Sequence, residues 1–384
     1  MTMQEFNDIR RSVKALCAHF PGEYWRALDA ERSYPTEFIT ALTKAGFLAA
    51  LIPEEYGGSG LTLLATCVIL EEIHSSGCNG SACHAQMYTM GTLLKHGSSE
   101  QKNRILPHIA DGTIRLQAFG VTEPSSGTDT TAIQTFARCE GSDYIINGQK
   151  VFTSRAEHSD FMLLLARTTP REKVRHKTEG LSVFLIDLRE AVGHGLSLRP
   201  IRTMMNHSTC EVFIDQLHVP VTHVIGEVDK GFCCILDSMN VERILIASEC
   251  VGDARWFIRK AADYARERVV FGRPIGSNQG VQFPIARAYA ATEAAALMVQ
   301  KAATLFDTCQ PCGAEANMAK LLAAEASWQA ADMCLQTHGG YGFAEQFDVE
   351  RKFRETRLYQ VAPVSTNMIL SYLGKHVLHL PESY

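Results

Sequence analysis

Apolar positions in the first part of the chain recur at the spacing of amphipathic helices. The stretch PEEYGGSGL at 53–61 interrupts this pattern as a glycine-rich loop. The sequence therefore predicts an N-terminal helical region over residues 1–114. Its expected helices are 5–19, 36–45, 64–75, 82–95 and 100–109.

The pattern changes between residues 115 and 226, where short runs rich in β-branched and aromatic residues are separated by turns. The dipeptide Asn147-Gly148 is typical of a tight turn. These features predict a central β domain, a small barrel or sandwich. Its expected strands are LQAFGV, AIQTFARC, DYIINGQKVFTS, FMLLLART, LSVFLIDL and EVFIDQLHV.

The helical period returns after Gly226, with long segments near 231–267, 281–307 and 314–337. The order helical, β, helical predicts an α+β fold with domains at 1–114, 115–226 and 227–384. Neither GxGxxG nor GxxxxGK[ST] is present, which argues against a Rossmann fold or a P-loop.

Composition narrows the class of protein. Hydrophobic residues make up 46% and charged residues 21%, and the net charge of −5 favours no nucleic-acid partner. No apolar run approaches the roughly 18–20 residues that a membrane helix needs. The start, MTMQEFNDIRRSVKAL, carries early acidic residues, unlike a signal or transit peptide. We therefore expect a soluble cytoplasmic protein.

Cysteine and histidine spacing gives no reason to expect a metal site. The only CxxC pair is Cys309 and Cys312 in CQPC, which lacks a second ligand pair for zinc and follows no predicted strand. The fourteen histidines form no HExxH or similar ligand set.

The stretch GVTEPSSGTD at 120–129 concentrates hydroxyl groups and glycines between two predicted strands. Such a loop offers hydroxyls and backbone N–H groups to a polar ligand that lies close to the main chain. The same composition also suits an ordinary hydrophilic turn. Composition alone leaves both interpretations open.

This stretch closely resembles TEPxAGSD, the flavin-contacting signature of the acyl-CoA dehydrogenase family. Other family motifs follow in order along nearly the whole chain. The resemblance implies bound FAD, a C-terminal four-helix bundle and a homotetramer or homodimer. The matching stretches are PEEYGGSG at 53, NGQKVFTS at 147, ARERVVFGRPIGSNQ at 265 and QTHGGYGFAEQFDVERKFRETRLYQ at 336.

The resemblance also assigns roles to residues. On the pyrimidine side of the flavin it places Phe119, Val121, Thr122, Gly127 and Thr128. At the other face it places Phe152 and Ser154, which replace a common Trp and Thr but keep an aromatic wall and a hydroxyl. The FAD of a neighbouring subunit would be reached by Arg268, Phe271 and Gln279, and its adenosine and pyrophosphate end by Gln336, Gly340, Ser365 and Asn367. Without the resemblance, Arg268 would be read as a surface charge and Gly340 as a helix C-cap.

The sequence departs from the family where many relatives carry their catalytic glutamate in a YEGT motif. Here Pro363 occupies the glutamate position and Ala362 the tyrosine position. Proline cannot take a proton and has no backbone N–H to polarise the thioester carbonyl. A different donor would have to supply that polarisation.

A smaller branch, the isovaleryl-CoA and long-chain enzymes, carries the base in a segment LxxERL, which MNVERILIA at 239 resembles. Glu242 falls at the base position, on one predicted stripe with Ile235, Met239 and Ile246. Burying an ionised acid there is costly, so its pKa is expected to rise toward neutrality, as suits a general base. The alternative is a buried pair with Arg243 that only fixes helices.

The implied reaction is removal of an α proton by Glu242 with hydride transfer from the β carbon to flavin N5. It would convert an acyl-CoA, or an acyl-carrier thioester, into a trans-2-enoyl product, with an electron-transferring flavoprotein as acceptor. Candidate substrate contacts are Asn240, Arg243 and Ala362, and the small Ala362 favours a branched or bulky acyl group. Two alternatives stay open: a flavin monooxygenase on the same scaffold and a non-catalytic flavoprotein.

Overall fold

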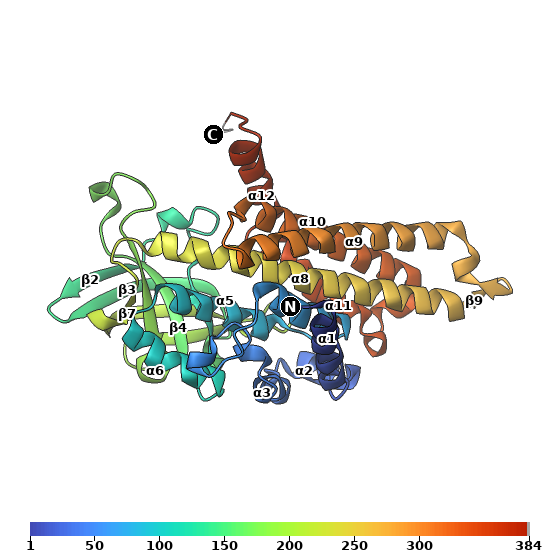
Figure 1. Ribbon diagram of the computed structural model, residues 1–384, viewed down its shortest axis with the longest axis horizontal. Coiled ribbons are helices and arrows are strands. Elements are labelled where there is room, and N and C mark those ends of the chain that lie inside the picture. The colour runs from blue at the N-terminus through green and yellow to red at the C-terminus, as the bar shows by residue number, and fades with distance from the viewer. Residues whose placement is uncertain (382–384) are drawn as a thin grey trace. The chain divides into compact units, whose positions relative to one another are not determined.

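The computed structural model describes residues 1–381, which pack as two compact units. Within the described residues, the helical unit comprises 1–31, 62–80 and 240–381, and the sheet unit comprises 32–61 and 81–239. Figure 1 labels many of their helices and strands. The predicted α+β class, with an N-terminal helical region, a central sheet and C-terminal helices, is confirmed. The three domain boundaries stay a prediction.

The first six helices include the five that the pattern predicts, with ends that agree within two residues. The unpredicted helix, α2, buries only Trp25 and so shows almost no apolar stripe. Two helices begin with a capping box, in which Thr2 or Ser98 exchanges hydrogen bonds with the third helical residue. The helices are α1 Met3–Cys17, α2 Gly22–Glu31, α3 Thr36–Lys44, α4 Leu63–Ser75, α5 Ser81–His96 and α6 Ser99–Ala110.

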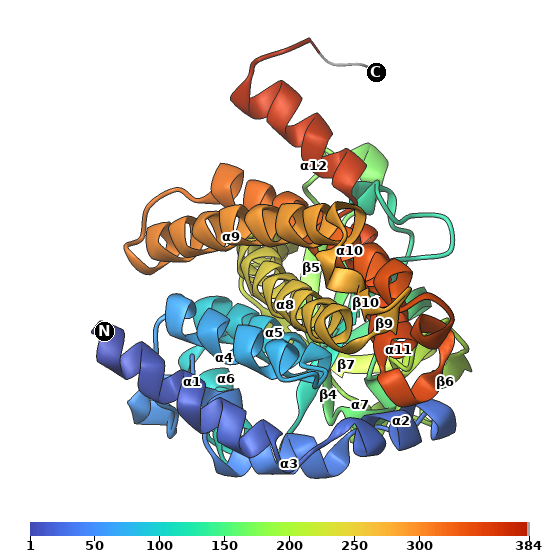
Figure 2. The same ribbon diagram turned by 90° about the vertical axis from the view of Figure 1, so that its right-hand side faces the viewer.

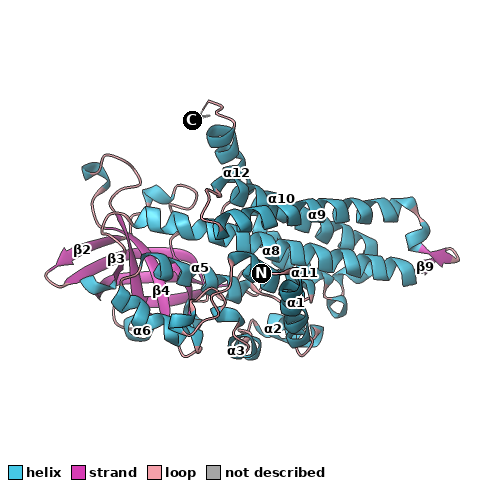
Figure 3. Cartoon of the chain, viewed as in Figure 1, coloured by secondary structure: helices cyan, strands magenta, loops and turns pink. Residues whose placement is uncertain are grey.

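The strands form one mixed sheet, coloured magenta in Figure 3, with the order β6-β7-β3-β2-β4-β5-β8 and β1 paired in parallel with β4. Most neighbours are antiparallel, as in meanders joined by short turns. The strands are β1 Leu116–Gly120, β2 Phe136–Glu140, β3 Asp143–Ser154, β4 Phe161–Arg167, β5 Leu181–Asp187, β6 Leu196–Ile201, β7 Thr209–Pro220 and β8 Val224–Ile225.

Strand β4 is buried on both faces, which explains its continuous apolar sequence FMLLLAR. Leu163 and Leu165 face one core cluster, which includes side chains of α5 and α6. Leu164 and Ala166 alternate with them and face a second cluster, which includes side chains of β3, β6 and β7. The sheet unit therefore has two cores, one on each side of β4.

The prediction of a tight turn at Asn147-Gly148 is wrong. Both residues lie inside β3, where the pairing with β7 changes register between Ile146 and Gly148. A Cβ atom on Gly148 would lie 2.7 Å from the Cα atom of Thr135, so the glycine permits a close approach of two backbones. The turn lies instead at 141–142, between the end of β2 and the start of β3.

The C-terminal part of the chain is built on three long helices: α8 Gly231–Glu267, α9 Gln279–Asp307 and α10 Gly313–His338. A short hairpin of β9 Val269–Val270 and β10 Arg273–Pro274 follows α8, and the shorter α11 Val349–Arg357 and α12 Thr366–Tyr372 follow α10. Helices α9 and α10 run side by side (Figures 1 and 2). The core of the helical unit is rich in alanine, which lets the helix axes approach closely.

Candidate functional site

In the sheet unit, five of the predicted flavin residues lie near the end of β1 and on the loop that follows it. Phe119 is half-buried near the end of this strand, with its ring 6.1 Å from that of Tyr88. Val121 and Thr122 are also half-buried, whereas Gly127 and Thr128 are exposed on the loop that follows. The loop therefore has a fixed base and an accessible tip.

A second element of this site is an irregularity in β3. The pairing with β7 shifts register between Lys150 and Thr153, and Phe152 lies in that shift with a φ angle of +59°. Such a left-handed conformation costs a non-glycine residue about 1–2 kcal/mol. The shift leaves the Phe152 ring 63% exposed. An aromatic side chain held in a strained and exposed state is a sign of a functional constraint.

The loop and the β3 irregularity lie side by side. The backbone N–H of Val151 donates to the carbonyl of Thr122 over 2.9 Å. Two residues beyond Phe152, the Ser154 Oγ atom is half-buried and lies 3.3 Å from the Thr209 Oγ1 atom. The sheet unit thus brings an exposed aromatic ring and nearby hydroxyls next to an irregular backbone, which suits a flat aromatic cofactor with polar edges.

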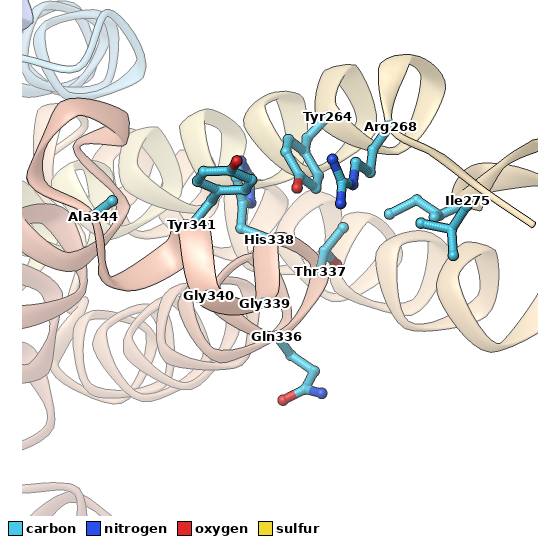
Figure 4. Close-up of a pocket in the computed structure, with 11 residues that line it drawn as sticks. Tyr264, Arg268, Ile275, Gln336, Thr337, His338, Gly339, Gly340, Tyr341 and Ala344 are labelled. Atoms are coloured by element: carbon cyan, nitrogen blue, oxygen red, sulfur yellow. The ribbon is translucent and has the colours of Figure 1, made fainter.

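In the helical unit, a shallow pocket of about 590 Å³ collects three more of the predicted residues (Figure 4). Arg268 lies just beyond the end of α8, with its guanidinium 5.9 Å from the centre of the Tyr341 ring. Gln336 and Gly340 lie at the end of α10, and the Gln336 side chain extends away from Arg268. The helix C-cap is Gly339, with φ +59°, rather than Gly340.

The other four predicted cofactor residues of the helical unit do not line this pocket. Phe271 is fully exposed at the tip of the β9–β10 hairpin with φ +52°. Gln279 is the exposed first residue of α9, and Asn367 is exposed in α12. Ser365 caps α12, because its hydroxyl accepts the backbone N–H of Met368. Their cofactor roles stay predictions.

Glu242 lies on α8 and is only 8% exposed, so the predicted burial of this acid is confirmed. Its neighbour Arg243 is also buried and donates to the Asn240 side-chain oxygen over 2.8 Å, while the Arg243 Nε–H has no hydrogen-bond partner. Burial lowers the pKa of Arg243, and the nearby Glu242 opposes that shift. The two charges therefore interact inside the helical unit.

Sequence reasoning missed Lys320, a fully buried lysine of α10. Its ammonium donates to the carbonyls of Tyr359 and Val364 over 2.6 and 2.7 Å. Burial lowers its pKa to about 8, Cys250 and Glu242 act in the opposite direction, and Arg243 lowers the pKa further. The alanine-rich pattern of α10 gives no signal of this role, because the acceptors are backbone groups distant in sequence.

Lys320 thereby holds both ends of the segment 359–364, which contains the two positions where the chain departs from the family motif. Ala362 and Pro363 are half-buried between its two hydrogen-bonded carbonyls. The segment offers no carboxylate, so within the described residues Glu242 is the acid that the family motif places at a base position.

Across residues 1–381, no three His, Cys, Asp or Glu side chains are grouped so as to hold a metal ion. None of the helices described here has the length and apolar character needed to cross a bilayer.

Three family models match the chain: "Acyl-CoA dehydrogenase, N-terminal domain" over residues 3–113, "middle domain" over 118–217 and "C-terminal domain" over 229–378. Acyl-CoA dehydrogenase FadE12 of Mycobacterium tuberculosis is 34% identical over 384 residues, covering 99% of this chain and 98% of the relative. The caffeyl-CoA reductase-Etf complex subunit CarC of Acetobacterium woodii is 32% identical and covers 87% of both chains. A solved glutaryl-coenzyme A dehydrogenase–glutaryl-CoA complex has a TM-score of 0.92 at 27% identity, covering 100% of this chain and 97% of that one.

Proposed function

The chain belongs to the acyl-CoA dehydrogenase family and uses FAD as its cofactor, and from this premise we propose that it oxidises an acyl-CoA to a trans-2-enoyl-CoA. Glu242 removes the α proton. The observation that carries this assignment is the combination of a buried carboxylate at 242 with a proline at 363, where many relatives hold their base. Bound FAD supplies the acceptor for the hydride that leaves the β carbon.

The surroundings of Glu242 support its role as a base. Its exposed fraction of 8% keeps bulk water away from the carboxylate, which strengthens every electrostatic interaction that it makes. Arg243 and Lys320 both respond to its charge. Burying an ionised carboxylate is costly, and two buried cations that interact with it offset part of that cost. The ionised carboxylate is the form that accepts a proton.

The cofactor would be held by the residues that the family motifs match. In the sheet unit these are Phe119, Val121, Thr122, Gly127, Thr128, Phe152 and Ser154. The exposed Phe152 ring supplies a surface on which a flat aromatic ring stacks. In the helical unit, the pocket containing Arg268 offers a cation and backbone groups to a phosphate-bearing part of FAD.

We propose a homotetramer or homodimer, because the helical unit exposes large apolar side chains that water does not favour. Phe271 is 100% exposed, and on α9 the exposed fractions of Phe283, Tyr289 and Leu297 are 55%, 56% and 68%. Light scattering should give a mass of two or four chains. A monomer at micromolar concentration would contradict the proposal.

Ala362 leads us to propose a branched or bulky acyl chain, because alanine leaves more room than the aromatic residue common at this position. A panel of straight and branched acyl-CoA substrates tests the proposal, together with the A362Y variant. We expect A362Y to lose activity on branched substrates more than on straight ones. Fastest turnover of short straight chains by the unaltered enzyme would contradict it. An electron-transferring flavoprotein is the proposed acceptor, in line with the Etf complex of the relative CarC.

The decisive experiment is anaerobic titration of the FAD-loaded protein with acyl thioesters, followed by the flavin absorbance. We expect E242Q to keep FAD but to lose at least about 100-fold in the rate of flavin reduction, since a general base contributes about 10²–10⁴-fold. The matched control is E267Q, on the same helix but exposed, which should reduce at the normal rate. Normal reduction in E242Q would remove Glu242 as the base. A wild-type protein that no acyl thioester bleaches without oxygen would favour a monooxygenase or a non-catalytic flavoprotein.

A further inference from the structure

A buried ion pair lies beneath the loop that begins at Val121. Lys150 of β3 has no exposed surface, and Glu123 of the loop is 6% exposed. The Lys150 ammonium donates to the Glu123 Oε1 atom over 2.8 Å and to the carbonyl of Val121 over 3.0 Å. One cation therefore holds a carboxylate and a backbone carbonyl of the same loop.

The Glu123 carboxylate connects the two ends of this loop. Its Oε2 atom accepts the backbone N–H of Gln134 over 2.6 Å, and its Oε1 atom accepts the N–H of Thr135 over 2.9 Å. The backbone of Glu123 also exchanges two hydrogen bonds with that of Ser126, at 3.0 and 3.1 Å. Residues 121–135 thus form a closed loop whose ends meet at one buried side chain.

A third buried charge holds the far part of the loop. Arg167, at the end of β4, is 5% exposed and donates to the carbonyls of Thr131 and Ile133 over 2.8 and 3.5 Å. The exposed residues Gly127 and Thr128 lie between these anchors. The side chains of the anchors point into the protein, while the residues predicted to contact the cofactor stay accessible.

Stability alone gives no reason to prefer buried charges at this position. A buried ion pair pays a large desolvation penalty, and well-packed apolar residues often serve as well or better. Charged side chains do, however, satisfy backbone groups that no regular strand or helix pairs, and charge-assisted hydrogen bonds are the stronger kind. Glu123 and Lys150 bond to each other and to irregular backbone of one loop, and Arg167 donates to that loop as well as to the carbonyls of Thr169 and Glu179.

We propose that Glu123 and Lys150, assisted by Arg167, are positioning residues that hold residues 121–135 in the shape that receives FAD before the cofactor binds. This inference rests on the proposed cofactor role of Val121 and Thr122. It does not depend on Glu242 or on the identity of the acyl group.

The charge on Lys150 makes the proposal testable through pH. Burial lowers the pKa of Lys150 to about 8, although Glu123 opposes the shift. The charges acting on this cluster are Glu123, whose pKa is itself lowered on balance by Lys150 and backbone N–H groups against its own burial, and Arg167, which interacts with the same carboxylate. Above about pH 8 the ammonium loses its charge. The clamp that Lys150 and Glu123 form on residues 121–135 should then loosen, and FAD affinity should fall between about pH 7 and about pH 9.

The experiment measures FAD affinity and backbone hydrogen exchange of the apoprotein for wild type, K150M and a control. The control is R138M, which removes an exposed cation paired with Glu140 on β2 of the same sheet. We expect K150M to weaken FAD binding at pH 7 by about tenfold or more, and to speed exchange of residues 121–135 by a similar factor without a general increase. It should also abolish the loss of affinity above about pH 8. R138M should match wild type.

Three results would overturn the proposal: K150M with wild-type affinity, unchanged exchange in residues 121–135, or a wild-type FAD affinity that is the same at pH 7 and pH 9. The last comparison uses only the wild-type protein, so it tests the proposal even if K150M fails to fold. Because every readout concerns FAD binding or the apoprotein, loss of the clamp is distinguishable from failure of Glu242 as the base. E242Q should bind FAD with the wild-type pH dependence.

Discussion

The sharpest prediction concerns a second buried ion pair, in the helical unit. Lys352 of α11 and Asp253 of α8 are both fully buried, and the ammonium contacts the Asp253 Oδ1 atom. Lys352 also donates to the carbonyl of Cys78 over 3.2 Å and lies 3.6 Å from a Glu355 oxygen. Burial by itself would raise the pKa of Asp253, but Lys352 and His74 lower it below its usual value. Substituting Lys352 by methionine would leave the carboxylate buried without its cation.

The size of the effect follows from that geometry. Two unit charges 4 Å apart attract by about 4 kcal/mol at an effective dielectric constant near 20, and breaking a buried pair by removing one partner costs about 3–5 kcal/mol. For units of about 150–250 residues, each kcal/mol shifts the unfolding midpoint by about 2–4 °C. K352M should therefore lower the midpoint by about 6–20 °C.

The charge of the His74 ring decides whether it can replace the cation that K352M removes from Asp253. Its Nδ1 atom lies 2.9 Å from Asp253 Oδ1, and the Gly80 N–H donates to its Nε2 atom over 2.9 Å. Burial lowers the pKa of His74 and the carboxylates of Asp253 and Glu249 raise it, so the carboxylates by themselves favour a charged ring whereas the Gly80 N–H requires an unprotonated Nε2. A charged ring would need a proton on Nε2, facing that N–H. Because the Gly80 bond is short and Glu249 is 3.5 Å away, the geometry favours the neutral ring, and His74 compensates little.

The assay is thermal unfolding of the FAD-loaded protein by circular dichroism, at fixed protein and cofactor concentrations. The control is R266M, which breaks an exposed pair with Asp263 in the same unit and should cost less than about 1 kcal/mol. The D253N/K352M double variant should recover part of the loss, since it leaves no buried charge unpaired. The reasoning fails if K352M loses no more stability than R266M. It also fails if the separate effects of D253N and K352M add up to the effect of the double variant within about 0.5 kcal/mol.

Three further predictions follow from single contacts. First, burial lowers the pKa of His338, whose ring stacks on Tyr264. The unfolded chain therefore binds a proton at this residue more readily than the folded chain, so stability should fall as pH drops below about 6.5. Unfolding midpoints measured from about pH 7 to pH 5 should depend less on pH in H338Q than in wild type. An equal pH dependence in the two proteins would argue against this residue. Second, F152G should remove the strain of a phenylalanine with left-handed backbone and raise the unfolding midpoint of the apoprotein by the equivalent of about 1 kcal/mol. FAD affinity measured by fluorescence should fall in this variant. Tighter FAD binding would contradict the stacking role. Third, both oxygens of Asp307 accept backbone N–H groups at the start of α4, from Leu63 and Leu64. D307A should cost about 1–2 kcal/mol in urea unfolding, as loss of a helix cap does, and a cost below about 0.5 kcal/mol would show that water replaces the cap.

The parts of the fold that the sequence predicts are those in which the burial of residues follows a local pattern, either a period or a continuous apolar run. Glu242 illustrates this, because its stripe of apolar neighbours predicts a buried acid and the structure buries it. Strand β4 is predicted as a strand because its whole run is apolar. A periodic pattern of apolar residues indicates which face of that helix or strand is buried, and it does not indicate which other segment packs against that face.

The elements that sequence reasoning missed depend on partners far along the chain. Helix α11 consists mostly of charged residues, VERKFRETR, yet Arg351 and Lys352 are fully buried in it. Arg26 of the unpredicted α2 pairs with Asp348, 322 residues away. The Asn147-Gly148 turn failed for a related reason, since the glycine serves the approach of Thr135 rather than a local reversal. Neither ionic partners nor close backbone contacts leave a local signal.

The cofactor roles of single residues, Glu242 as the base, the oligomer and the cytoplasmic location stay predictions. Each depends on a molecule or a compartment that the structure of one chain does not contain. What the structure adds is a physical reason for two buried lysines to which the sequence analysis assigned no role. Lys150 holds the backbone next to the predicted flavin contacts, and Lys320 holds the backbone on both sides of Ala362 and Pro363. Each is a buried ammonium that donates to carbonyls of irregular chain.

A lysine suits this task because its ammonium carries three donors on a long apolar stem. Irregular segments next to a binding site leave carbonyls unpaired by helix or sheet, and a buried carbonyl without a donor is costly. A fixed cation meets that need and also places a charge close to the site. The position of a buried lysine among backbone carbonyls is therefore evidence that the segment it holds has to keep one shape. The proposed sites for FAD and for a thioester would impose that requirement on residues 121–135 and 359–364.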